Sequence, residues 1–101
     1  MIIDISILSK QKCSFAGIYN GHEVTDIIPY EFDREMVSVY CSDPDYAQAY
    51  GFTKFYKNVW QKMVPVQDIS FLHAEITGLD GSIQHIPVSV KEMQEIHSAQ
   101  N

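Results

Sequence analysis

The densest apolar pattern of the chain lies in a fourteen-residue segment, YGFTKFYKNVWQKM at residues 50–63. A helix turns about 100° per residue, so it would gather one set of side chains on a single face and turn the lysines to the other. That set consists of Ala49, Phe52, Phe55, Tyr56, Val59, Trp60 and Met63. The spacing predicts one long helix whose aromatic face packs in the core, and it favours this over a ligand-binding aromatic box. Tyr46 and Tyr50 fall at the boundary of the face, where they could meet a partner or rim the core.

The signals that flank this segment are typical of a helix start and a helix stop. Asp43 is a good N-cap residue, Pro44 suits the first helical position, and Asp45 complements the positive end of the helix dipole. Pro65 ends the pattern, because proline cannot continue a helix or donate to it. Gly51 lowers helix propensity and predicts a kink within the helix.

The rest of the chain indicates strands. Ile3, Ile5 and Ile7 alternate with polar residues, as in a half-buried strand, and 36–41 is a short β-branched strand. The Asn20-Gly21 pair predicts a type I′ hairpin turn, and Asp80-Gly81 predicts a second hairpin between 66–77 and 82–90. In the first hairpin, one face is expected to hold Cys13, Phe15, Tyr19, Val24 and Ile28.

The predicted elements describe an α+β fold in one domain, residues 1–101. It has an antiparallel sheet of about five or six strands, one long helix packed on one face and a short C-terminal helix over 89–99, where Ser89 and Glu92 are spaced as a capping box. The 46% hydrophobic and 20% charged composition argues against disorder. Two cysteines are too few for a disulfide framework. With no signal-peptide pattern and no span of about 20 apolar residues, we expect a cytoplasmic protein that does not enter membranes.

Two sets of residues suggest catalysis, and each has a structural explanation that the sequence favours. Cys41 precedes a predicted helix N-terminus, which can lower a thiol pKa, but no base or oxyanion site is evident, so we expect a packed cysteine. His73 and Glu75 match the H-x-E element of zinc deaminases, but no P-C-x-x-C follows, which favours a surface pair. Phosphate-binding glycine motifs are absent as well. We therefore predict no catalytic residue, cofactor or metal.

The four histidines have no ligand spacing such as H-x-x-x-H. If the second hairpin turns tightly at Asp80 and Gly81, then His73 and His85 point to opposite faces of it. Scattered histidines without a shared metal are the expectation.

Negative charge is concentrated in residues 22–45. Seven acids and one arginine give this segment a formal charge of −6, which equals the net charge of the whole chain. A solvated acidic face is the ordinary explanation, but such a field also repels nucleic-acid phosphates and attracts basic proteins. The partner-binding residues predicted on this basis are Glu23, Asp26, Tyr30, Glu31, Asp33, Glu35, Asp43, Asp45 and Tyr46.

The leading hypothesis is a small acidic non-enzymatic protein-binding module. Its partner would be a basic protein surface or complex, such as a nuclease, a toxin or a nucleic-acid-binding complex, with no direct nucleic-acid contact. Immunity proteins and phage-encoded inhibitors share this size and charge, which is an analogy only. Two alternatives stay open: an enzyme or enzyme subunit that uses Cys41 or the His73/Glu75 pair, and a structural module that self-associates as a homodimer.

Overall fold

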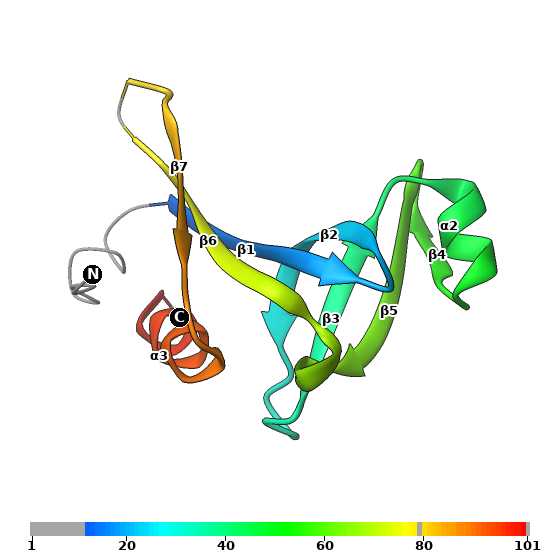
Figure 1. Cartoon of the computed structure of the whole chain (residues 1–101), viewed down its shortest axis with the longest axis horizontal. Coiled ribbons are helices and arrows are strands. Elements are labelled where there is room, and N and C mark those ends of the chain that lie inside the picture. The colour runs from blue at the N-terminus through cyan, green and yellow to red at the C-terminus, as the bar shows by residue number, and fades with distance from the viewer. Residues whose placement is uncertain (1–11, 79, 101) are drawn as a thin grey trace.

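The computed structural model describes residues 12–78 and 80–100, and their body is one antiparallel sheet (Figure 1). Seven described strands lie in the order β4-β5-β3-β2-β1-β6-β7. They are β1 (Lys12–Tyr19), β2 (His22–Pro29), β3 (Met36–Cys41), β4 (Thr53–Tyr56), β5 (Val59–Pro65), β6 (Ser70–Thr77) and β7 (Ile83–Pro87). The helices are α2 (Pro44–Ala49), α3 (Val90–Gln100) and the 3₁₀ turn η1 (Val66–Asp68). The strand predicted around Ile3–Ile7 lies outside the described residues.

The first hairpin is confirmed. Tyr19 pairs with His22, so Asn20 and Gly21 form a two-residue turn between β1 and β2. Both turn residues have positive φ, 50° and 80°, as a type I′ turn requires. Asn and Gly adopt this region at little cost, which is why the pair is so informative in a sequence.

The sheet changes its pairing at a bulge in β2. This strand pairs with β1 up to Val24 and with β3 from Thr25 onward, and Asp26, inside the irregular stretch between Thr25 and Ile28, has a φ of 51°. The extra residue reverses the alternation of the strand beyond it. Consequently Ile27 is buried, at 2% exposed, and Ile28, which was predicted to face the core, is 43% exposed.

The prediction of one long helix over the aromatic segment is wrong. Helix α2 starts as expected, with the Asp43 carboxylate accepting hydrogen bonds from two backbone N–H groups, but it has only six residues. Gly51 follows with a φ of 76°, and the Phe52 N–H donates to the Ala47 carbonyl over 2.9 Å. A left-handed glycine with this backbone bond is a Schellman motif, which ends a helix. Gly51 therefore terminates α2 and does not kink a longer helix.

The remainder of the aromatic segment forms the β4–β5 hairpin. Tyr56 pairs with Val59, and Asn58 in the turn between them has a φ of 56°. The side chains predicted to be core are mainly at the surface, with Phe55 60% and Tyr56 69% exposed. Over residues 12–78 and 80–100 the molecule is thus mostly antiparallel sheet, with a one-turn helix and a C-terminal helix, and no long helix covers a face of the sheet.

Substitutions at Asn58 distinguish the hairpin from a helix by the sign of their effect. In the hairpin turn, Asn58→Gly should be more stable than Asn58→Ala by about 1–2 kcal/mol, because a Cβ is unfavourable at positive φ. In a helix, alanine would be favoured over glycine by about 1 kcal/mol. Chemical denaturation of the two variants measures this difference. A more stable alanine variant would contradict the hairpin.

One part of the core lies between the sheet and α3, and another lies at the α2 end, where Tyr46 and Phe52 are buried. The predicted capping box is confirmed, since the Ser89 hydroxyl accepts from the Glu92 N–H and the Glu92 carboxylate accepts from the Ser89 N–H. From this start α3 buries Met93 and Ile96, which are both 0% exposed. The sheet residues that are most deeply buried are Val24, Ile27, Val37, Val39 and Val64.

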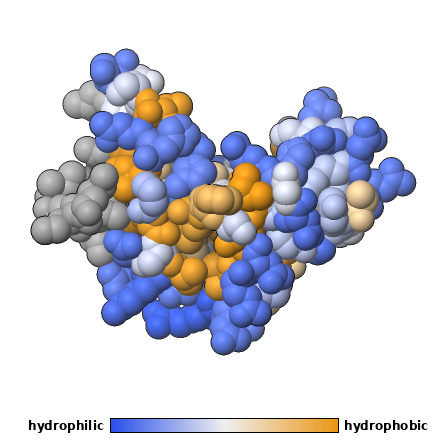
Figure 2. All heavy atoms as spheres, viewed as in Figure 1, coloured by the Kyte–Doolittle hydropathy of each residue, from blue (hydrophilic) through white to orange (hydrophobic). Residues whose placement is uncertain are grey.

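The two ends of the sheet carry different helices. Figure 1 shows α3 beside the β6–β7 end, and α2 beside β4 at the opposite end. Between these ends, hydrophobic side chains gather in the hollowed middle of the visible face (Figure 2). None of the described helices is long and apolar enough to cross a membrane.

Candidate functional site

The loop between β2 and β3, residues 30–35 and here called the acidic loop, holds three of the predicted partner-binding carboxylates. Its backbone is fixed by the Tyr30 N–H, which donates to the Met36 carbonyl over 3.0 Å, and by the Met36 N–H, which donates to the Asp33 carbonyl over 3.1 Å. The Asp33 carboxylate also accepts from the Glu35 N–H at 2.9 Å. The loop is therefore an ordered turn, and it presents its side chains from a defined backbone.

Two further hydrogen bonds tie the acidic loop to distant segments. The Gln94 side chain on α3 donates to the Arg34 carbonyl over 2.8 Å. The Val66 N–H at the start of η1 donates to the Glu35 carbonyl, also over 2.8 Å. Because both contacts use backbone oxygens of the loop, the side chains of Arg34 and Glu35 stay exposed.

An aromatic side chain projects between the carboxylates of the loop. Phe32 is 79% exposed, and its ring meets the Tyr30 ring edge to face at a centroid distance of 5.6 Å. Glu31, Asp33 and Glu35 are all exposed, and within the described residues no lysine or arginine forms an ion pair with them. With Arg34 the loop has a formal charge of −2.

A surface pocket of about 350 Å³ lies between the acidic loop and α3. Its lining residues are Pro29, Tyr30, Glu31, Arg34, Gln94, His97 and Ser98. Beside the protruding Phe32 ring the molecule thus offers a concave region, edged by polar and charged groups, that could receive a side chain from a partner.

The remaining predicted acids lie away from this loop. The six residues of β3 separate the loop from Asp43 and Asp45 on α2, which is a distance of about 20 Å along the strand. Asp43 caps α2 and also faces His22 at 3.5 Å, and Glu23 follows His22 at the same end of the hairpin. Asp26 sits at the bulge between the two ends. Contiguity in sequence therefore does not bring all seven acids into one patch.

Tyr46, the second predicted aromatic contact, is part of the core. It is only 7% exposed, and its hydroxyl donates to the Tyr19 carbonyl. Its ring stacks on His22 at 4.2 Å between centroids and also contacts Phe52 at 5.3 Å. Burial raises the pKa of the Tyr46 phenol to about 12. Although Tyr46 was predicted as a contact residue, its side chain has little surface to offer a partner.

The environment of Cys41 is that of a packed thiol. The side chain is 4% exposed in the core, its thiol donates to the Asp43 carbonyl over 4.0 Å, and burial raises its pKa. A nucleophilic cysteine needs a lowered pKa and access to substrate. Cys41 meets neither requirement, because its pKa is raised and its side chain is buried.

The β6–β7 hairpin groups three polar side chains that the sequence had separated. The strands pair Thr77 with Ile83 and Glu75 with His85, so the connection between them is five residues long, not two. A two-residue turn at Asp80 and Gly81 would have placed each side chain of β7 on the opposite face of the hairpin from the one that this register gives it. The prediction that His73 and His85 point to opposite faces is therefore wrong.

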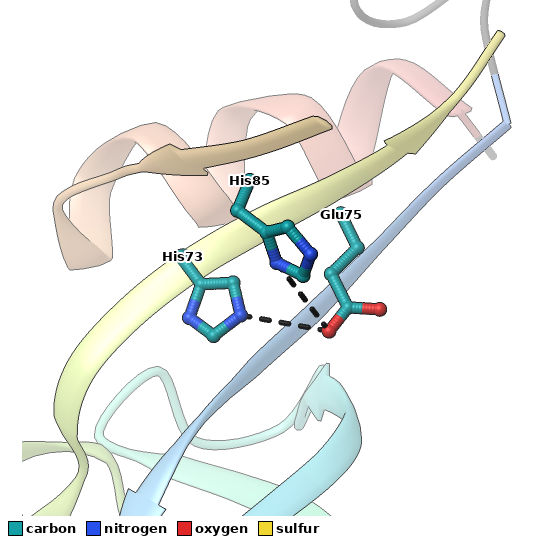
Figure 3. A group of neighbouring side chains, drawn as sticks. All are labelled: His73, Glu75 and His85. Atoms are coloured by element: carbon teal, nitrogen blue, oxygen red, sulfur yellow. Dashed lines mark ion pairs between the residues drawn. The ribbon is translucent and has the colours of Figure 1, made fainter. Parts of the chain in front are cut away.

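Figure 3 shows His73, Glu75 and His85 converging on one face of the hairpin. His73 Nε2 lies 3.5 Å and His85 Nδ1 lies 3.9 Å from the same oxygen, Oε1 of Glu75. One ligand atom from each residue lies within 4.8 Å of the others. Two imidazoles and a carboxylate are a donor set that suits first-row transition metals. We refer to these three residues as the histidine cluster.

Comparison with known proteins finds no family model, no curated protein and no solved structure that matches the chain. Function is therefore argued from the acidic loop and the histidine cluster themselves. Phe32 in the loop was visible in the sequence as an aromatic flanked by acids. His85 was missed, because only the strand register places it opposite Glu75.

Proposed function

We propose that this protein is a non-enzymatic binding module that docks through its acidic loop on the basic surface of a partner protein. One observation carries the proposal: Phe32 is 79% exposed in a loop whose three exposed carboxylates form no ion pair with any described lysine or arginine. An exposed aromatic ring of this kind costs solvation free energy unless a partner covers it.

The chemistry of the loop fits a protein with a positively charged cleft. Carboxylates on an ordered turn attract such a cleft from a distance and accelerate encounter. Phe32, supported by the Tyr30 ring, would then supply buried apolar contact after docking. Occupation of the cleft by the loop would block its substrates. Nucleic acid is a poor partner for the same loop, since phosphates would be repelled.

A photo-crosslinking amino acid at position 32 tests this proposal. The full chain carrying p-benzoylphenylalanine in place of Phe32 is produced in cells that naturally contain the protein, and the cells are irradiated. We expect one dominant crosslinked product whose partner is a protein with a basic surface. Mass spectrometry identifies the partner and the attachment site.

Phe71 supplies the matched control, because it is an equally exposed phenylalanine, at 83%, on a different element, β6. The same crosslinker at position 71 should not yield the product. Equal yields at the two positions, a product containing only a second copy of this chain, or no product at position 32 would each contradict docking through the acidic loop.

A further inference from the structure

We propose that the histidine cluster is a binding site for a divalent first-row transition metal ion, with zinc as the reference ion. His73 and Glu75 are two residues apart on β6 and so share a face of the strand, and His85 is the direct cross-strand partner of Glu75 on β7. The site thus rests on paired strands of the sheet, which hold its ligands at a fixed spacing.

The three donor atoms lie within 4.8 Å of one another, and two of their separations are close to those of a coordinated ion. Zinc binds imidazole nitrogen and carboxylate oxygen at about 2.0–2.2 Å, so tetrahedral ligand atoms lie about 3.3–3.5 Å apart. The contacts of Glu75 Oε1 with the two histidines measure 3.5 Å and 3.9 Å. To bind one ion, His85 Nδ1 would have to move closer to the other two donor atoms. The His85 side chain is 61% exposed and therefore has room to rotate.

A hydrogen bond to the backbone holds the His73 ring in an orientation suited to a metal ligand. His73 Nδ1 lies 2.9 Å from the Phe71 carbonyl, which can only accept, so this nitrogen carries a proton. In the neutral imidazole the lone pair is then on Nε2, the atom that faces Glu75. Metal-binding histidines commonly donate their other N–H to a backbone carbonyl in this way, which fixes both the tautomer and the ring orientation.

The Nε2 lone pair of His73 and the Glu75 carboxylate oxygen face each other, and a metal ion placed between them could bind both. The two atoms lie 3.5 Å apart. Two imidazoles and one carboxylate also leave a coordination position open, as zinc sites with three protein ligands do.

The surroundings of the cluster are apolar and accessible. A shallow pocket of about 300 Å³ adjoins both histidines and is otherwise lined by Phe71, Leu72 and Pro87. A metal ion could enter from this side.

Zinc chloride titrated calorimetrically into the untagged full chain at about pH 7.5 tests the site, since neutral imidazoles are required for binding. We expect one ion per chain and a zinc-dependent rise in Tm. His85→Ala and Glu75→Gln should each weaken zinc binding by at least about tenfold. Substituting residues that only hydrogen-bond to a metal ligand already lowers metal affinity by about 10- to 100-fold. Both variants keep the Phe71 hydrogen bond, and circular dichroism verifies their folding.

His22→Ala is the matched control, because it removes a histidine that also faces a carboxylate, that of Asp43, but lies outside the cluster. Its zinc affinity should equal that of the unsubstituted chain. Absence of zinc binding, affinity that survives in the His85→Ala and Glu75→Gln variants, or an equal loss in His22→Ala would overturn the proposed site. None of these measurements involves the acidic loop, so this site and the docking proposal can fail independently.

Discussion

Replacing Glu31 and Glu35 by lysine is expected to slow association with the partner captured at position 32 by between about tenfold and 1,000-fold at low salt. The two substitutions convert the acidic loop from attractive to repulsive toward a basic surface. Asp33 is left in place because its carboxylate accepts from the Glu35 N–H. Stopped-flow or biosensor kinetics at several salt concentrations measures the effect, and the difference should shrink as salt screens the charges.

The control for this change reverses two acids at the far end of the β2–β3 region. Glu23→Lys combined with Asp45→Lys alters the net charge by the same amount, and both side chains are exposed. We expect this variant to associate at close to the unsubstituted rate under the same conditions. If it slowed association as much as the loop variant does, the general charge of the chain, not the loop, would govern docking.

Truncation of Tyr46 to alanine should lower the free energy of unfolding by about 3–5 kcal/mol, the usual cost of removing a buried aromatic ring. The loss would remove the ring contacts with His22 and Phe52 and the donor to the Tyr19 carbonyl. Urea denaturation followed by fluorescence and circular dichroism gives the value. For a protein of this size such a change is a large part of the total stability.

Tyr56 provides the comparison, since it is a tyrosine of the β4–β5 hairpin that is 69% exposed. Tyr56→Ala should change stability by no more than about 0.5–1 kcal/mol, as exposed substitutions usually do. Similar effects at the two positions would mean that Tyr46 is not the buried residue described above. Tyr46 would then again be a candidate contact residue for the partner.

Local chemistry made several elements of the fold predictable from the sequence. Asn20-Gly21 meets the positive φ demanded by a two-residue turn, Asp43-Pro44 starts a helix, and Ser89 with Glu92 caps another. Each signal acts within four residues and depends little on what packs around it. For that reason all of them hold in the folded molecule.

The prediction for the aromatic segment was wrong because one periodic pattern spans three elements, α2, β4 and β5. Phe52 closes the Schellman motif of α2, whereas Phe55 and Trp60 belong to the two strands of a hairpin. Their spacing matches a helix face only when the interruptions are ignored. Gly51 and Asn58, the two residues of this segment with positive φ, mark the end of the helix and the hairpin turn. Tertiary pairing with β3 then favours strand over helix for β5.

The two candidate sites were visible to different degrees. The acidic loop is continuous in sequence, so its residues could be identified directly, although its separation from Asp43 and Asp45 depends on the length of β3. The histidine cluster depends on register. A shift of one residue between β6 and β7 would send His85 to the other face, and the sequence around Asp80 and Gly81 did not determine that register.

The most direct test of docking through the acidic loop places the crosslinker at position 32 in the two charge-reversed chains. Yield is compared in the same cells, with expression and folding of both chains verified. The crosslinked product should disappear when Glu31 and Glu35 are lysine and persist when Glu23 and Asp45 are lysine. Undiminished crosslinking in the loop-reversed chain would contradict the proposal that these carboxylates bring the partner to Phe32.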